Sequence, residues 1–459
     1  MPPMVIDRDQ ALQVMREALN ASPADQTEVV LMDGDRSFTR YANSVVHQNM
    51  SERNLSLGVR VAIGKRLGHS STNVLDSESV RQAVDRAVSI ARLSEETPDF
   101  VSLPRLSPPS VARGGSPDVG EMDGSYVQET AEFRPEQRAG AAAAMFKEAA
   151  SCGFHVAGAF STEAFGFGVA NSLGVTRFSR STQASLTAIV GSDKGSGYSA
   201  SASRDARCLD PLAVVREASE KCSLNRSPVP LEPGEYDVIL EGRAVAEALF
   251  YLGYMGFGAL AVQEGRSFMS GSLGKKLLGE NITLWDDGLD PAGFALPFDF
   301  EGVPKRKVVF FERGVARDVV YDSLTAGREG KSSTGHALPA PNTMGPIPVN
   351  LFLEPGEAGL EEIISGSDKA VLVTRFHYIG LVHPSKAVLT GMTRDGTFLV
   401  EKGRISRALK NLRFTESMLK VLSQVEAISR DTVLEPLGPG AVAAPALKVR
   451  GFCFTGVTG

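Results

Sequence analysis

The chain has 459 residues, a formal net charge of -6 and an isoelectric point near 5.7. This length exceeds one ordinary hydrophobic core and predicts two or three domains. With 42% hydrophobic and 22% charged residues, the composition is that of a soluble globular protein. The acidic balance and the absence of a dense Lys/Arg run argue against direct nucleic-acid binding.

The N-terminal segment and the cysteines both point to the cytoplasm. The sequence MPPMVIDRDQALQVMREALN lacks the basic region and apolar core of a secretion signal. The four cysteines form no C-x-x-C pair, so we expect ordinary buried thiols in a reducing compartment. They are Cys152, Cys208, Cys222 and Cys453.

Residues 1–96 are predicted to form a helix, a sheet and a second helix. Apolar residues at helical spacing mark the two helices. They are Ala11, Leu12, Met15, Ala18 and Leu19 in the first, and Val80, Ala83, Val84, Ala87, Ile90 and Ala91 in the second. Between them, TEVVLM, FTRYANSVVHQN and LSLGVRVAIGKRLGHSSTN alternate like antiparallel hairpin strands, with turn signals at Asp33-Gly34-Asp35 and Gly64-Lys65.

Residues 97–230 are predicted to hold a linker, a helix and a central β-meander. The segment from Thr97 to about Gly124 is rich in Pro, Gly and Ser, as surface linkers are. The helix PEQRAGAAAAMFKEAAS, the meander AGAFSTEAFGFGVANSLGVTRFSRSTQASLTAIVG and a helix in PLAVVREASEKC follow. A second linker, LNRSPVPLEPGEY, places the main domain boundary near residue 230.

Residues 231–459 are predicted to be β-rich. The expected strands are YDVILEG, KRKVVFF, VNLFLEPG, AVLVTRFHYIGLV, GTFLVEKGRIS and LKVRGFCFTG, with hairpin turns at Arg313-Gly314 and Lys402-Gly403. The expected helices are VAEALFYLGYMGFGALAV and ESMLKVLSQVEAIS. We therefore expect an α+β protein, with an N-terminal helix-plus-antiparallel-sheet domain before a barrel-like C-terminal domain.

The stretch VAEALFYLGYMGFGALAV is the most apolar part of the chain and holds one charge, Glu247. Its glycines and its carboxylate argue against a membrane span. A lone carboxylate in such a run is costly to bury unless it is paired, protonated or used for chemistry.

Motif spacing alone predicts no catalytic site. None of the six histidines stands in H-E-x-x-H. His377 and His383, six apart on an expected strand, would lie roughly 20 Å apart, too far for one metal ion. The G-x-S-x-G elbow is absent, and the phosphate-loop and dinucleotide-loop patterns are incomplete.

Several blocks resemble the TldD/PmbA family of peptidases, also known as the modulator of DNA gyrase family, in the right order along nearly the whole chain. They are TRYANSVVHQNMSERNLSLGVRVAIGKRLGHSSTN, QEGRSFM, LWDDGLDPAGFALPFDFEGVPKRKVVFFERGV, YDSLTAGREGKSSTGHA and TGMTRDGTFLVEKGRISRALKNLRFT. The resemblance implies one of two branches. TldD-like subunits hold a metal ion with H-E-x-x-x-H and a cysteine, whereas PmbA-like (TldE) subunits lack these ligands and pair with a TldD-like partner.

Carried over to this chain, the family's metal motif falls on residues 246–251. Glu247 matches the family's glutamate, but Ala246 and Tyr251 stand where the histidines would be. The ligand cysteine would fall in PLGPGAVAAP, which has none. The resemblance therefore implies that this chain binds no metal ion or other cofactor and that zinc is held only by a TldD-like partner.

The leading hypothesis is a PmbA-like, metal-free subunit of a cytoplasmic TldD/PmbA-type metallopeptidase complex, shaping the cavity that holds a peptide substrate. Five residues are expected to line that cavity, although each is also typical of a turn or a surface ion pair. They are Arg266, Asp286, Asp287, Asp299 and Glu301.

Two other functions remain open. The chain could be a homodimeric, metal-independent enzyme acting on peptides or amino-acid-like metabolites, with Glu247 as a general base. It could also be a non-enzymatic peptide-binding scaffold. Both alternatives predict a homodimer rather than a heterodimer.

Overall fold

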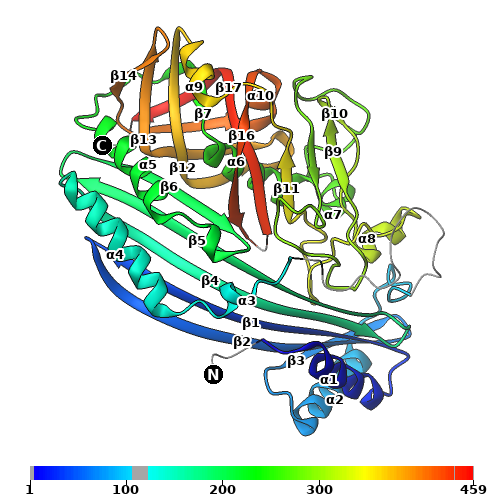
Figure 1. Ribbon diagram of the computed structural model, residues 1–459. Helices are drawn as coiled ribbons and strands as arrows, with labels where there is room; N and C mark the ends of the chain where they lie inside the picture. Colours follow the sequence, from blue (N-terminus) through cyan, green and yellow to red (C-terminus); the bar gives the residue numbers. More distant parts are fainter. Residues whose placement is uncertain (1–4, 106–121, 123, 439, 458–459) are drawn as a thin grey trace.

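The protein is an α+β structure built on two sheets, seen in this computed structural model for residues 5–105, 122, 124–438 and 440–457 (Figure 1). A six-stranded antiparallel sheet forms the N-terminal half, and an 11-stranded mixed sheet forms the C-terminal half. This arrangement confirms the predicted fold class. Much of the linker expected between Thr97 and Gly124 lies outside the described residues.

The N-terminal sheet has the strand order β3-β2-β1-β4-β5-β6. Its strands are β1 (Gln26–Ala42), β2 (Val45–Ile63), β3 (Arg66–Thr72), β4 (His155–Asn171), β5 (Thr176–Ser192) and β6 (Gly195–Ser203). Strand β1 pairs with β4 from Glu28 to Tyr41, so one sheet includes strands from the predicted ranges 1–96 and 97–230. The division into 1–96, 97–230 and 231–459 stays a prediction.

One predicted turn of this sheet is confirmed and one is wrong. Gly64-Lys65 connects β2 to β3, but Asp33-Gly34-Asp35 lies inside β1. The strand continues there because the buried Asp33 carboxylate accepts hydrogen bonds from Arg53 and from the main-chain N–H of Ile6. The β1–β2 turn is instead Asn43-Ser44, with φ angles of 50° and 57°, as a tight hairpin turn requires.

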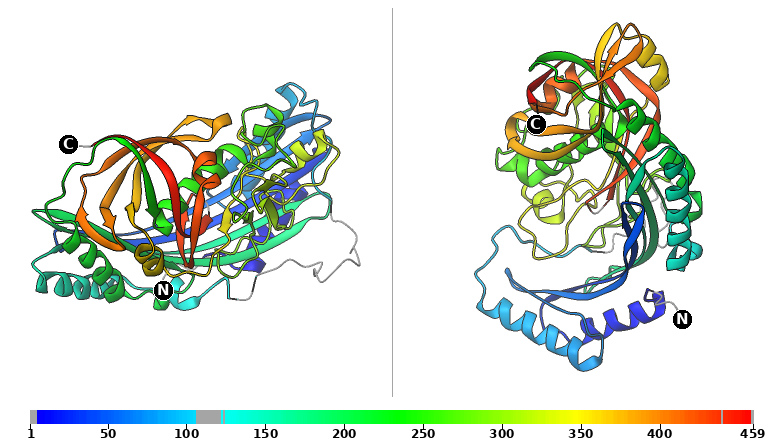
Figure 2. Two further views of the ribbon diagram at one scale, coloured as in Figure 1. Left: turned by 90° about the horizontal axis from the view of Figure 1, so that it is seen from above. Right: turned by 90° about the vertical axis from the view of Figure 1, so that its left-hand side faces the viewer.

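Helices cover one face of this sheet in two pairs. Side chains alternate across a strand, so Val29 and Leu31 of β1 face helices while Val30 faces the C-terminal half. Figure 2 shows this layering, with the C-terminal half seated on the opposite face. The helices are α1 (Arg8–Ala21) and α2 (Ser77–Leu93) at one end, and α4 (Pro135–Ser151) and α5 (Pro211–Leu224) at the other.

The two N-terminal helices have nearly the apolar faces that their spacing predicts. Ala11, Met15 and Ala18 of α1 are buried. In α2, however, Ile90 is 45% exposed and Val88 is buried in its place. The buried stripe of α2 is therefore turned slightly from the predicted one.

The C-terminal sheet contains a closed ring of strands. Along the sheet, β17, β15, β13, β12 and β7 are neighbours, and β17 also pairs with β7. This closure makes the half barrel-like, as predicted. Its strands are β7 (Gly234–Leu240), β8 (Leu284–Asp286), β9 (Val308–Glu312), β10 (Val315–Ala316), β11 (Asn350–Leu353), β12 (Lys369–His383), β13 (Val388–Glu401), β14 (Arg404–Ala408), β15 (Leu412–Ser417), β16 (Val425–Leu437) and β17 (Gly440–Val457).

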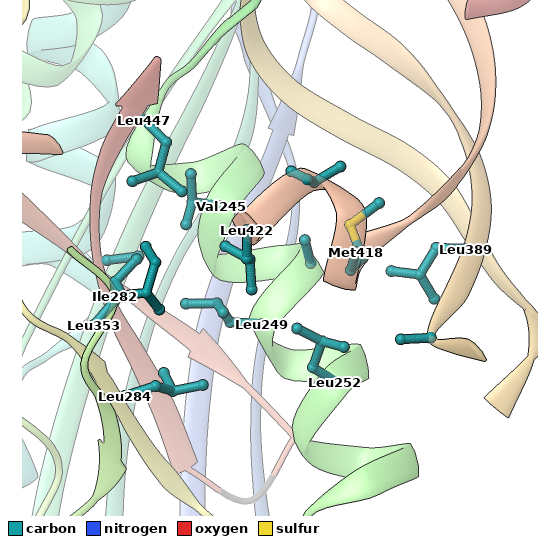
Figure 3. Packing of buried hydrophobic residues seen from close by; sticks show 14 of the residues in the cluster. Val245, Leu249, Leu252, Ile282, Leu284, Leu353, Leu389, Met418, Leu422 and Leu447 are labelled. Atoms are coloured by element: carbon teal, nitrogen blue, oxygen red, sulfur yellow. The ribbon is translucent and has the colours of Figure 1, made fainter. Parts of the chain in front are cut away.

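Helix α6 (Gly242–Gly256) packs into the core of this half. Figure 3 shows Val245, Leu249 and Leu252 meeting side chains from α10 and the surrounding strands. The turns at Arg313-Gly314 and Lys402-Gly403 are confirmed as the β9–β10 and β13–β14 connections. The remaining helical segments are α3 (Gln128–Ala131), α7 (Ala259–Gln263), α8 (Ser323–Arg328), α9 (Leu360–Ser365), α10 (Met418–Ser423), η1 (Ala206–Cys208) and η2 (Pro384–Lys386).

The helix predicted in ESMLKVLSQVEAIS is shorter than expected. Only Met418–Ser423 is helical, and Val425 begins strand β16. Pairing with β17 along β16 outweighs the local helical pattern. Among the helices that the structure describes, none combines the length and apolar character needed to span a membrane.

Close packing of α5 on the sheet depends on Gly197 of β6. A Cβ atom there would lie 2.1 Å from the Ala218 carbonyl oxygen and 2.4 Å from the Cys222 nitrogen. We predict that Gly197→Ala lowers the free energy of unfolding by about 1–3 kcal/mol, because the helix backbone must shift. Gly140→Ala, at an exposed α4 position with nothing within 4 Å, should raise it by up to about 1 kcal/mol. Urea unfolding of both variants tests this, and equal effects would contradict it.

Candidate functional site

Glu247 lies on the second turn of α6, half-buried at the edge of the core. Its Oε2 atom accepts a hydrogen bond from the main-chain N–H of Phe376 in β12, at 2.9 Å. The carboxyl group therefore links α6 to a neighbouring strand of the C-terminal sheet.

The surroundings of Glu247 favour its protonated form. Burial raises the pKa of Glu247 from its ordinary 4.5 to about 8, and the Glu435 carboxylate adds to this rise. The Arg375 guanidinium, the Phe376 N–H and Arg243 act in the opposite direction without overcoming burial. Glu247 thus exchanges a proton near neutral pH.

Two arginines near Glu247 form ion pairs within the C-terminal half and also contact strand β6 of the N-terminal sheet. Arg243 of α6 pairs with Glu435 at 2.9 Å and also donates to the Ala200 carbonyl of β6. Arg375 of β12 donates through Nε to Asp395 of β13 at 3.0 Å. Both guanidinium groups approach the ring of Tyr198 in β6, with distances to its centroid of 5.7 Å for Arg243 and 4.2 Å for Arg375.

The positions that align with the family's metal ligands do not fit a zinc ion. Ala246 is fully buried and has no ligand atom, and the Tyr251 hydroxyl donates to the Ile379 carbonyl at 3.0 Å. Glu247 alone would hold an ion weakly. Within the described ranges, no three His, Cys, Asp or Glu side chains are grouped so as to hold a metal.

The cysteines are all free thiols, but two differ from the prediction. Cys222 is buried and Cys453 is partly buried in β17, whereas Cys152 and Cys208 are exposed. Cys152 follows helix α4 and Cys208 ends the short helix η1, so both lie at surface turns. Cysteine alone carries no signal that separates such positions from core positions.

A cavity of about 470 Å³ lies between the six-stranded sheet and the C-terminal half. The sheet contributes alternate residues of β4 and β5 that point away from the helices. They include Ser161, Glu163, Ser181, Gln183 and Ser185. The opposite wall includes Phe294, Phe300, Lys305, His336 and Asn350. The loop that would carry the family's ligand cysteine contributes Pro436, Gly438 and Gly440.

A buried histidine–aspartate pair supports the C-terminal wall of this cavity. His336 Nε2 lies 2.7 Å from Asp286 Oδ1, and Asp286 Oδ2 accepts from the N–H groups of Val349 and Asn350, both at 2.7 Å. Burial alone would raise the pKa of Asp286, but His336, Lys305 and the Asn350 N–H hold it below its usual value. Burial and Lys305 lower the pKa of His336, which favours a neutral imidazole.

The structure shows the partners of the five residues predicted to line a substrate cavity. Asp286 is behind His336, and Asp299 accepts three main-chain hydrogen bonds, from Glu301, Val303 and Ala337. Glu301 pairs with Arg60 at 3.2 Å and accepts from the Ser323 N–H.

The remaining two are closer to the surface. Asp287 is half-buried and accepts from the Leu289 N–H, and Arg266 is exposed and pairs with Glu264. In the described part of the chain, none of the five is among the residues lining the 470 Å³ cavity. A role for them in substrate binding stays a prediction.

Sequence reasoning missed the residues that do line the cavity. Ser181, Gln183 and Ser185 alternate along one strand, and polar alternation on a covered strand is a signal that could have revealed this wall. Lys305 stands in the basic segment PKRK and gives no sequence signal of burial. His336 lies within one of the blocks that carry the family resemblance, but not in a spaced motif.

Two sequence models of one family match this chain. The PmbA/TldA metallopeptidase C-terminal domain matches residues 233–456, and the PmbA/TldA metallopeptidase domain 1 matches residues 27–91. The chain belongs to the PmbA/TldD family.

Individual relatives are more distant. The crystal structure of TldE from Thermococcus kodakarensis has a TM-score of 0.87 at 22% identity, covering 97% of this chain and 100% of that chain, which shows a shared fold. An uncharacterised protein of Methanocaldococcus jannaschii is 42% identical over 102 residues, 22% of this chain and 24% of its own length. A metalloprotease of Methanothermobacter thermautotrophicus is 27% identical over 216 residues, 45% of either chain. The aligned segments thus span less than half of these two curated relatives.

The environment of Glu247 makes a prediction about stability and pH. Because its folded pKa of about 8 lies above the ordinary 4.5, the folded chain binds this proton more tightly than the unfolded chain. The stabilisation is complete below about pH 4.5 and is lost as the pH rises through about 8. Glu247→Gln should therefore reduce the fall in melting temperature between pH 5.5 and pH 8.5. Exposed Glu220→Gln is the control, and identical pH curves for all three proteins would contradict the prediction.

Proposed function

We propose that this chain is the PmbA/TldE-like subunit of a TldD/PmbA-type peptidase complex. In this proposal it binds no catalytic metal, shapes the cavity that holds an extended peptide, and pairs with a TldD-like subunit that supplies zinc. The complex would process peptides in the cytoplasm and would not bind nucleic acid directly.

One observation carries the proposal. Glu247 stands at the position of the glutamate in the family's metal helix. The buried Ala246 and Tyr251, whose hydroxyl donates to the Ile379 carbonyl, stand at the two histidine positions. Glu247 Oε2 accepts a hydrogen bond from the main-chain N–H of Phe376. Such a chain needs a partner for metal-dependent hydrolysis.

The cavity supports the peptide part of the proposal. Its sheet wall is polar and its opposite wall adds phenylalanine rings, a combination that accommodates both the main chain and the side chains of a peptide. Recognition through main-chain hydrogen bonds tolerates many sequences, as peptide trimming requires. Likeness to a structure of TldE favours the same branch.

Glu247 also favours a second function, a metal-independent enzyme acting as a homodimer. A carboxyl group with a pKa of about 8 suits acid–base catalysis near neutral pH. Against this role, its Oε2 is occupied by the Phe376 N–H, and the residue is not among those lining the 470 Å³ cavity.

Co-purification tests the proposal. The chain is expressed with a TldD-like protein of the same organism, and each chain and the pair are assayed on unstructured peptides and analysed for zinc. We expect a stable pair, activity only in the pair, and less than about one metal ion per several copies of this chain alone. Stoichiometric zinc in the isolated chain, or full activity of either chain alone, would contradict it.

A substitution separates the two functions. Glutamine imitates the protonated carboxyl group, so Glu247→Gln should leave the activity of the pair within about twofold if Glu247 only positions the helix. A loss of about a hundredfold with normal assembly would instead assign acid–base work to Glu247.

A further inference from the structure

Lys305 places a buried amine at the wall of the 470 Å³ cavity. The side chain is 4% exposed, and its main-chain N–H donates to the Pro297 carbonyl at 2.9 Å. Its stem packs on Gly288, where a Cβ atom would lie 2.8 Å from Lys305 Cγ. The side chain is therefore held against one wall rather than free to move into solvent.

The ammonium group lacks a hydrogen-bond acceptor in the described part of the chain. Two carboxylates, those of Asp286 and Asp299, interact with its charge. All four of their oxygen atoms are already engaged by other groups. These groups are His336 and the main-chain N–H groups of Val349, Asn350, Glu301, Val303 and Ala337. Lys305 lines the cavity, where a bound molecule can supply an acceptor for the three N–H bonds of its ammonium group.

Asn350 provides the complementary group on the same wall. It is 1% exposed, and its Nδ2 donates to the Phe294 carbonyl at 2.7 Å, which fixes the orientation of the amide. Its Oδ1 is buried without a hydrogen-bond partner among the described residues. Asn350 and Lys305 both line the cavity and both interact with Asp286, which accepts the Asn350 N–H and acts through its charge on the pKa of Lys305.

Charge decides which molecule fits these two groups. Burial lowers the pKa of Lys305, and the carboxylates of Asp286 and Asp299 act against this lowering. Arg36 and Glu163 add one charge of each sign to the cavity lining. A further anion is not favoured there, whereas a neutral carbonyl oxygen accepts from an ammonium without adding charge. Asn350 Oδ1 needs an N–H donor. One neutral acceptor and one donor on adjacent atoms make a peptide unit.

We propose that Lys305 and Asn350 form a subsite for an internal unit of a bound peptide, with Lys305 donating to its carbonyl oxygen and Asn350 accepting from an N–H. This inference rests on the proposed peptide cavity and specifies its ligand. The subsite takes a peptide in mid-chain and does not recognise a free carboxylate end.

The test uses a fluorescein-labelled nine-residue peptide of Ala, Leu and Ser, with its C-terminus free or amidated. Binding to the full chain, alone and with its co-purified partner, is followed by fluorescence anisotropy. We expect Lys305→Met to weaken binding about tenfold or more, because a charged hydrogen bond is lost. Lys307→Met is the matched control, since the Lys307 ammonium lies 4.2 Å over the Trp285 ring and does not line the cavity. Both forms of the peptide should bind alike.

A second arm changes only the ligand. Each peptide N–H is replaced in turn by an ester oxygen, which removes the donor and keeps the carbonyl. One position should weaken binding to the wild-type chain about tenfold, and the same ester should cost nothing further in Asn350→Leu. This arm on the wild-type protein stands even if a variant fails to fold.

The outcomes separate the subsite from the proposed function. Peptide binding that is equal in Lys305→Met and Lys307→Met, or that no ester weakens, overturns the subsite and leaves the peptide cavity standing. A free-acid peptide that binds more than tenfold tighter than the amidated one also overturns it. Absence of peptide binding to the wild-type chain and to its complex overturns both.

Discussion

The structure depends on how charge is buried where the two sheets meet. The C-terminal half covers one face of the six-stranded sheet, so ionisable groups at this junction lose water and need partners within the protein. Lys221 of α5 reaches Glu241 before α6 at 2.6 Å, and Ser196 of β6 donates to Asp395 of β13 at 2.7 Å. These contacts fix the sheet against the barrel, and the cavity lies between the surfaces that they hold together.

The same constraint explains the polar side chains of helix α6. A helix buried among the strands of the barrel can tolerate one polar side chain only if that side chain is satisfied. Glu247 meets this condition through the Phe376 N–H and a raised pKa. Tyr251 meets it through the Ile379 carbonyl. Glu247 and Tyr251 are thus structural contacts between α6 and β12.

The spacing of apolar residues predicted most elements of the fold. In amphipathic helices and alternating strands this spacing shows which face is buried. The two turns at Arg313-Gly314 and Lys402-Gly403 were predictable, because glycine adopts positive φ at little cost. The closed ring of strands was not, since the pairing of β7 with both β12 and β17 joins segments far apart in the chain. The turn predicted at Asp33-Gly34 is wrong because the ion pair between Asp33 and Arg53 outweighs the local turn signal.

In the candidate site, too, some features could be predicted from the sequence and others depend on the fold. Glu247 stood out because one charge interrupts an apolar run, and its partner could not be named because it is a main-chain N–H of another strand. The acidic residues predicted to line a cavity accept main-chain hydrogen bonds. The spacing of residues in the sequence does not reveal such bonds. Lys305 and Asn350 became visible only as a pair, when the fold placed a lysine and a buried amide oxygen on one wall.

We propose that peptides occupy the cavity between the two sheets. The most direct measurement is photo-crosslinking of a benzophenone-bearing peptide to the purified chain and to its complex, with the crosslinked residues identified by mass spectrometry. We expect crosslinks on both walls, to β4 or β5 around Glu163 and Gln183 and to the segment around Phe294 and Phe300. Crosslinks confined to the outer faces of the helices, with none on these walls, would contradict it.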